Sequence, residues 1–166
     1  MRSIPGVLSA ATTTNMPLVG GSWGHDVHVG SNEGPSKFTW VSPGYFETMR
    51  IPLIMGRDFN PSDTIGSLRV AVVNEMFVRR YLGRINPLGQ TVRTGQEPDY
   101  PSTVYQIVGV IPDTKYNNLR DATPPMAFAP ASQFPAPGPW IVMLIHSHEE
   151  PAAMLGELKG AVAFCR

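Results

Sequence analysis

Residues 70–82 read VAVVNEMFVRRYL and join a strand to a helix. The run of small and β-branched residues at its start predicts a strand that is buried on both faces. Asn74 is a favoured N-cap residue for the helix that follows, and Gly83 is a typical C-terminal stop. Phe77 and Tyr81 lie one turn apart, so they predict the buried face of this helix.

Strand patterns occupy much of the remaining chain, and helix patterns are few. Apolar alternation or continuous apolar runs predict extended segments at Gly6–Thr13, Trp23–Val29, Lys37–Val41, Thr91–Arg93, Val104–Ile111, Met126–Ala129 and Trp140–His146. We expect Ser31–Ser36 to be a hairpin loop. A short helix is predicted from Ser42, as N-cap, to about Arg50, and a last helix after Glu149. Helices follow strands irregularly, which indicates the α+β class.

Composition excludes several classes of protein. The chain has 166 residues, with 16 glycines and 17 prolines, so many short elements are expected and a helical bundle is not. Its 13 basic residues balance its 13 acidic residues, and no basic stripe is present. Nucleic-acid binding is therefore not predicted.

Cysteine content and hydrophobicity restrict the chain further. Cys165 is the single cysteine, so an intramolecular disulfide is impossible and a cysteine-based metal site is not expected. The longest apolar run, Trp140–Ile145, is far shorter than the roughly 20 residues of a membrane span. Pro5 and Gly6 interrupt any signal-peptide pattern. The sequence as given predicts a soluble piece.

Four histidines were weighed as metal ligands. His25 and His28 are three residues apart, which places them on opposite faces of a strand unless a turn brings them together. His146 and His148 share a strand face, with Glu149 near them, but no third or fourth ligand is identifiable. Metal binding by either pair stays an open alternative to ordinary exposed or hydrogen-bonded histidines.

No active site is evident from the residues. The chain has no G-x-S-x-G nucleophile motif and no glycine-rich phosphate loop, and Cys165 has no histidine near it in sequence. Asp58 and Asp63 are a candidate acid–base pair, but they fit better as residues that close turns. We therefore predict no catalytic, cofactor-binding or metal-binding residues.

An ordered series of motifs is more specific than any one of them. It consists of Val41–Met49, Gly56–Phe59 with Asp63, Val70–Glu75, Asn86–Gln90 and Tyr105–Ile111. In this order and at these spacings, the series closely resembles the MacB-like periplasmic core domain of bacterial ABC transporter permeases. Ile4–Val7 and the Glu-Pro-Ala-Ala segment at 150–153 are also similar to that family, so the resemblance covers nearly the whole chain.

The resemblance implies an architecture and a role. It implies a porter-like α/β subdomain built from residues 1–66 and 116–166, with a smaller α/β subdomain inserted at 67–115. Such a domain lies on the periplasmic side of the bacterial inner membrane in its parent protein. It is not an enzyme and uses no cofactor, and it couples membrane-side movements to substrate or partner handling. The implied partners are the transmembrane and nucleotide-binding parts of the same transporter, a second copy in the full-length permease, and a periplasmic partner protein.

Structural roles were assigned to five residues. Tyr45 and Phe46 are expected to anchor the short helix, Gly56 and Gly109 to permit close backbone contact, and Asn74 to cap its helix. Aromatic residues of Gly20–Trp40 and the connector Phe134–Trp140 were the candidates for partner contact, against ordinary packing. Two further alternatives stay open: a small ligand-binding or hydrolytic α+β protein, and a free-standing interaction module.

Overall fold

The computed structural model describes residues 6–19, 23–97, 100–116, 118–134, 141–150, 154 and 156. Strands dominate, which confirms the predicted mixture of many strands and few helices. The elements are β1 (Val7–Thr13), β2 (Gly24–Val29), β3 (Asn32–Val41), α1 (Tyr45–Thr48), β4 (Met55–Gly56), β5 (Val70–Asn74), α2 (Glu75–Tyr81), β6 (Thr91–Thr94), β7 (Val104–Ile111), β8 (Met126–Pro130), the 3₁₀ helix η1 (Ala131–Gln133) and β9 (Val142–Ser147).

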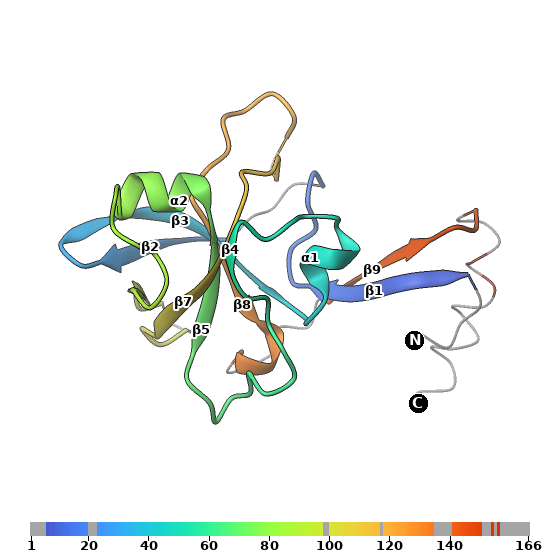
Figure 1. Cartoon of the computed structure of the whole chain (residues 1–166), viewed down its shortest axis with the longest axis horizontal. Coiled ribbons are helices and arrows are strands. Elements are labelled where there is room, and N and C mark those ends of the chain that lie inside the picture. Colours follow the sequence, from blue (N-terminus) through green and yellow to red (C-terminus); the bar gives the residue numbers. More distant parts are fainter. Residues whose placement is uncertain are drawn as a thin grey trace.

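Most of the strands form a closed ring (Figure 1). Neighbours pair in the order β2, β6, β7, β5, β8 and β3, and β2 also pairs with β3. The β5–β7 and β3–β8 pairs are parallel, whereas the other pairs of the ring are antiparallel. Closure satisfies the backbone groups that an open sheet would leave at its edges. We call these strands the ring.

Strands β1 and β9 form an arm that extends away from the ring (Figure 1). They pair antiparallel from Val7 opposite Ser147 to Thr13 opposite Val142. The arm joins the ring where Thr13 pairs with Val41 of β3. The first and last strands of the chain therefore run side by side.

Two hydrophobic cores lie on opposite faces of the ring strands. The interior core includes Phe38 and Trp40 of β3 and receives Phe77 from α2. The second, which we call the junction core, lies where α1 and the arm meet the ring and includes Phe46 and Phe128. All residues of β5 and β8 are buried because each strand faces both cores. This confirms the prediction of a strand buried on both faces for β5.

The pairing of residues 67–115 bears on the predicted subdomains. Strand β5 of this segment pairs with β8, and β6 pairs with β2, so both neighbours lie in the proposed porter-like segments 1–66 and 116–166. The β5–β8 and β2–β6 pairings are both part of the closed ring. The structure therefore does not confirm the inserted subdomain, and its boundaries stay a prediction.

Two local predictions were wrong. The hairpin turn is confined to residues 30–31, because Val29 pairs with Asn32 and the strand β3 runs through the segment 31–36 that was expected to be a loop. The N-cap of α1 is Gly44 in the left-handed region, and no side chain caps this helix. Ser42 has a different role, since its Oγ accepts a hydrogen bond from the Thr12 amide.

Other local predictions are confirmed. Asn74 Oδ1 accepts a hydrogen bond from Phe77 N at 3.0 Å and so caps α2. Gly56 and Gly109 pair across β4 and β7. A Cβ atom on Gly56 would lie 2.1 Å from the Val108 carbonyl oxygen, and one on Gly109 would lie 2.5 Å from the carbonyl oxygen of the residue after Gly56. Both positions therefore require glycine.

Within the described residues, we find no helix of the length and hydrophobicity that crossing a bilayer requires. The predicted helix after Glu149 falls mainly on residues outside the described part of the chain, as does Cys165.

Candidate functional site

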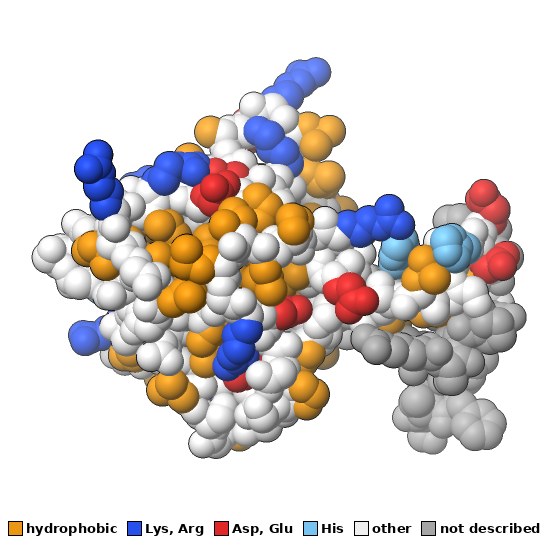
Figure 2. Space-filling model, viewed as in Figure 1, with side chains coloured by type: hydrophobic (Ala, Val, Ile, Leu, Met, Phe, Trp, Pro, Cys, Tyr) orange, Lys and Arg blue, Asp and Glu red, His pale blue; other side chains and the backbone are white. Residues whose placement is uncertain are grey.

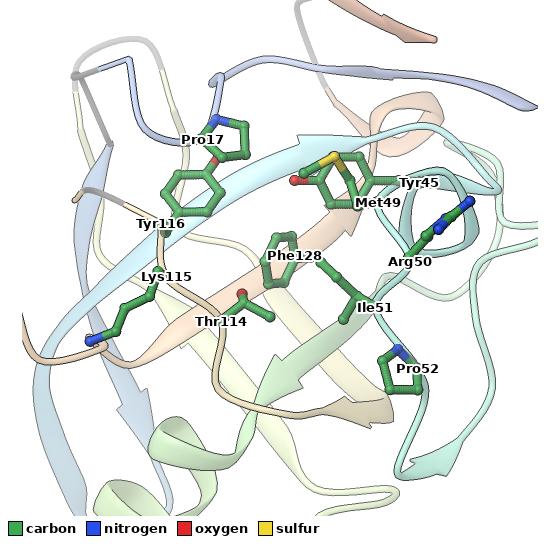
Figure 3. A pocket seen from close by; sticks show the side chains of 10 residues that line it. All are labelled: Pro17, Tyr45, Met49, Arg50, Ile51, Pro52, Thr114, Lys115, Tyr116 and Phe128. Atoms are coloured by element: carbon green, nitrogen blue, oxygen red, sulfur yellow. The ribbon is translucent and has the colours of Figure 1, made fainter. Parts of the chain in front are cut away.

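A pocket of about 260 Å³ opens beside the junction core (Figure 3). One wall is formed by Tyr45 of α1 and by the segment 49–52 that follows this helix. The opposite wall is formed by residues 114–116, and Phe128 of β8 lies between the two. Pro17, which lies beyond the end of β1, completes the lining. The pocket therefore depends on four segments that are distant in sequence.

Tyr45 contributes a hydroxyl group to this pocket. Its side chain is 1% exposed, and its hydroxyl points into the space between the two walls (Figure 3). The hydroxyl makes no hydrogen bond to any residue that the structure describes. Burial raises the pKa of Tyr45 well above its usual range, and the neighbouring Tyr116 adds to this effect. The hydroxyl thus stays protonated and is able to donate a hydrogen bond.

Tyr116 fixes the opposite wall. Its hydroxyl donates a hydrogen bond to the Asn15 carbonyl at 2.7 Å, and its own carbonyl accepts one from Leu18 N at 2.7 Å. Burial raises the pKa of Tyr116. These bonds tie the loop after β1 to the segment after β7, so the wall is held from both ends.

The charged groups at the pocket are both cationic. Arg50 and Lys115 line it, and no Asp or Glu is found among the described lining residues. Arg50 donates a hydrogen bond to His146 Nε2 at 2.8 Å, and Lys115 donates one to the Asp121 carbonyl at 2.6 Å. Neither cation forms an ion pair with a carboxylate of the described residues. Their charged ends point away from the space between the two walls (Figure 3).

His25 and His28 do not come together. They lie on opposite faces of β2, His25 being 3% exposed and His28 exposed. His25 Nδ1 lies 3.0 Å from Glu97 Oε1 without hydrogen-bond geometry, and burial lowers the pKa of His25 although Glu97 opposes this. Trp23 packs on the imidazole at a ring-centroid distance of 4.6 Å. Within the described residues, no group of three or more potential ligands could hold a metal ion.

The other candidate residues have structural partners. His146 contacts Arg50, and the backbone N–H of His148 donates to the Gly6 carbonyl. Asp63 accepts two hydrogen bonds from Arg57, at 2.8 and 2.9 Å.

Asp58 accepts a hydrogen bond from the Phe59 amide through Oδ1. Burial raises the pKa of Asp58, whereas the hydrogen bonds from Arg57 lower that of Asp63. Both carboxylates stabilise the loop after β4, which fits the turn-closing role.

The expectation of exposed aromatic residues in Gly20–Trp40 was wrong for Phe38 and Trp40, whereas Trp23 is partly buried. Phe38 and Trp40 are 1% and 3% exposed, because the face of β3 that carries them points into the interior core. Phe134, at the start of the connector, packs on Trp40 at a ring-centroid distance of 4.4 Å. Residues 135–140 of that connector lie outside the described part of the chain.

Exposed apolar side chains gather elsewhere. Leu53, Ile54 and Met55, at and before β4, are all exposed. Figure 2 shows hydrophobic side chains concentrated on this face of the ring. The sequence signal is the uninterrupted apolar run at 51–55, which by itself indicates no binding role.

Sequence reasoning also missed the residues that define the pocket. Tyr45 was identified only as an anchor of α1, and Arg50 only as the end of that helix. Lys115 and Tyr116 were given no role from the sequence. No spacing in the sequence could have found them, because their proximity depends on the closed ring.

Comparison with known proteins gives consistent results. The profile of the MacB-like periplasmic core domain matches residues 1–161. The periplasmic region of MacB from Actinobacillus actinomycetemcomitans has a similar structure, with a TM-score of 0.67 and 17% identity. That match covers 93% of this chain and 65% of the other, so this chain spans less than two thirds of it.

Two further solved structures share the fold. The extracellular domain of the noncanonic ABC-type transporter YknZ from Gram-positive bacteria gives a TM-score of 0.62 at 11% identity, covering 93% of this chain and 72% of the other. A permease-protein domain from Porphyromonas gingivalis gives a TM-score of 0.63 at 15% identity, covering 96% of this chain and 70% of the other. A search of curated proteins finds no match. Because the profile extends over nearly the whole sequence, the chain belongs to the MacB-like periplasmic core domain family.

Proposed function

We propose that this chain is the extracytoplasmic domain of an ABC-type transporter permease on the periplasmic side of the inner membrane. The profile match over residues 1–161 carries the proposal. The domain is non-catalytic and acts through its surfaces and through rigid-body movement. Its partners are the membrane-spanning and nucleotide-binding parts of the same transporter, a second copy of the permease and a periplasmic protein.

The arm supports a mechanical role. Val7 lies opposite Ser147, so the chain enters and leaves the described body at neighbouring positions. A domain inserted between two membrane spans needs this arrangement. The ring is closed and has two packed cores, so a displacement applied at the arm is expected to move the ring as a unit.

Sidedness can be tested in cells that produce the full-length permease. We replace the native cysteines, Cys165 included, by serine and introduce Val104→Cys at an exposed position of β7. A membrane-impermeant maleimide should label this site once the outer membrane is permeabilised. Labelling that requires lysis of the inner membrane would contradict the proposed location.

Movement can be tested by distance measurements between spin labels on the permease in lipid nanodiscs. A label on Met143→Cys reports on the arm, and the pair Val104→Cys and Ile85→Cys reports on distances within the body that contains the ring; all three positions are exposed. Trapping the ATP-bound state should change the Met143–Met143 distance between copies and leave the ring pair unchanged. An unchanged Met143 distance would refute coupling.

A further inference from the structure

We propose that His25 and Glu97 form an acid-sensitive latch, which holds the loop between β6 and β7 on the interior core and releases this loop when the pH falls. The described residues of the loop are 95–97 and 100–103. The proposal concerns a conformational switch in the ring and does not depend on the transport role. It rests on the contacts of the loop and on a buried histidine that faces a carboxylate.

The loop is fixed at its base and again farther along. At the base, the Gly95 amide donates to the Asp26 carbonyl of β2 at 2.8 Å. Farther along, Glu97 and Tyr100 exchange two backbone hydrogen bonds, of 2.9 and 3.1 Å. Residues paired in this way direct their side chains to the same face. Glu97 and Tyr100 therefore contact the body of the ring together.

Tyr100 holds the loop through aromatic contacts. Its ring lies edge-on to Trp23 at a centroid distance of 3.8 Å. It also lies 5.4 Å from Phe134 and 6.0 Å from Trp40, both of which are buried in the interior core. These distances are typical of attractive aromatic pairs. Movement of the loop away from the ring separates Tyr100 from the core and exposes aromatic surface.

Glu97 supplies the polar part of the latch. Its Oε2 accepts a hydrogen bond from Trp23 Nε1 at 3.2 Å, and its Oε1 lies 3.0 Å from His25 Nδ1. The second contact lacks hydrogen-bond geometry, and His25 Nδ1 has no hydrogen-bond partner among the described residues. A carboxylate can only accept, so the contact is attractive when Nδ1 carries a hydrogen. Glu97 thus connects the loop to two aromatic side chains of the ring.

The surroundings of His25 disfavour a positive charge. The residue is 3% exposed. The nearest ring is that of Trp23, at a centroid distance of 4.6 Å, and the rings of Phe38, Tyr100 and Trp40 lie at 6.0, 6.4 and 6.5 Å. A buried imidazolium loses most of its hydration, and apolar neighbours replace little of it.

Two carboxylates oppose this effect. Glu97, from the loop, favours the charged imidazole most, and Asp26, from the same strand, adds to it. Burial outweighs both, so the pKa of His25 is lowered and the closed form favours the neutral ring. The other charged or titratable side chains of the adjoining strands lie on the outer faces of β2, β3 and β6: His28, Glu33, Lys37 and Arg93.

Acid opens the latch because the open form takes up a proton more readily. With the loop released, water reaches His25 and its pKa returns to the ordinary value of 6.5. Below this pH the open form gains a proton that the closed form disfavours, so the equilibrium shifts toward the open form. At pH 5 the shift is at most about thirtyfold, which is ten raised to the difference between 6.5 and 5.

The test is amide hydrogen exchange of the 166-residue chain, followed by NMR from pH 7.5 to 5 and corrected for the intrinsic pH dependence of exchange. The reporters are the amides of Gly95, Glu97 and Tyr100, all of which are hydrogen-bonded in the closed form. We expect their protection factors to fall by about threefold to thirtyfold at pH 5. The Phe77 amide, bonded to Asn74 Oδ1 in α2, should keep its protection.

Variants assign the effect to His25. His25→Gln removes the titrating group and should abolish the pH dependence, and His25→Phe is a second non-titrating variant that restores an apolar ring. His28→Gln is the matched control, because His28 lies 3.4 Å from Glu33 on the exposed face of the same strand. It should behave like the wild-type protein. Glu97→Gln removes the charge that favours the imidazolium, so the His25 ring signals should titrate at a lower pH.

Three results would overturn the proposal. One is constant protection of the loop amides while His25 gains its proton, which would mean that the closed form tolerates the charge. Another is an equal loss of protection at Phe77, which would indicate unfolding of the whole body. The third is an acid-induced loss that persists in both His25→Gln and His25→Phe. A loss that is confined to the loop, retained in His28→Gln and absent from both non-titrating variants would support the latch.

Discussion

Arg50 occupies the position after the C-cap of α1, where glycine is usual. Its amide donates to the Glu47 carbonyl at 3.0 Å, and Ile51 N donates to the Phe46 carbonyl at 2.8 Å. This pair of bonds is the Schellman motif, which requires a left-handed residue between them. Arg50 meets the requirement with φ at 54°. We therefore predict opposite outcomes for two substitutions that both remove the guanidinium.

The expected difference follows from the backbone alone. Arg50→Gly and Arg50→Ala both lose the 2.8 Å contact with His146, so that loss cancels when the two variants are compared. Alanine retains the steric cost of a left-handed L-residue, whereas glycine does not. The greater freedom of glycine in the unfolded chain offsets part of this gain. Arg50→Gly should therefore be the more stable variant by about 1 kcal/mol.

Thermal and urea denaturation of the 166-residue chain would measure the difference. For a chain of this length, about 1 kcal/mol corresponds to roughly 2–4 °C in melting temperature. The wild-type protein should fall near Arg50→Gly, because its exposed bond to His146 contributes about 0.5–1.5 kcal/mol and offsets its strain. Equal stability of the two variants, or a more stable alanine variant, would refute the Schellman interpretation.

Four further predictions concern stability, measured by urea denaturation. Gly109→Ala should cost several kcal/mol, roughly 3 or more, because its Cβ would lie 2.5 Å from a backbone oxygen, whereas Gly66→Ala, with open space around it, should have little effect. Asn74→Ala should cost about 3 kcal/mol, since it removes a helix cap and two further hydrogen bonds, one buried and one partly buried; a loss below about 1 kcal/mol would contradict that role. Asp63→Asn should cost about 1 kcal/mol at pH 7, and the difference from the wild-type protein should begin to shrink as the pH falls below about 4 and be lost only below the lowered pKa of Asp63, because the fold is stabilised only where this carboxylate is ionised. His25 also makes stability depend on pH, because burial lowers its pKa in the folded protein. Stability should decline as the pH falls below about 6.5, where the unfolded chain gains a proton that the fold disfavours. A His25→Gln variant that declines equally would contradict this.

Local features were predictable where the residues themselves carry the signal. Asn74 caps α2 as expected, since the amide side chain satisfies a helix N–H within its own turn. The β-branched run of β5 predicted burial on both faces. One face of the strand packs in the interior core and the other in the junction core. Gly56 and Gly109 were assigned to close backbone contact, which β4 and β7 confirm.

Features that depend on distant contacts were not predictable. Phe38 and Trp40 alternate on a strand whether that strand faces solvent or a core, so the pattern could not show that they are buried. The pocket combines Tyr45, Tyr116 and Phe128, and no local rule relates a helix, a loop and a strand that are separated by so many residues. The pocket therefore had no counterpart among the expected sites.

The sequence by itself determined the element types, the capped helix after β5, the absence of a nucleic-acid footprint and the family of the chain, because these depend on residue identity and short spacing. Tertiary structure alone decided that β2 pairs with β3 to close the ring, that β1 and β9 leave it as an arm, and that Tyr45 and Tyr116 line one pocket. The physical reason is that strand pairing is chosen by the sum of many weak, non-local contacts, which no single segment of the chain specifies.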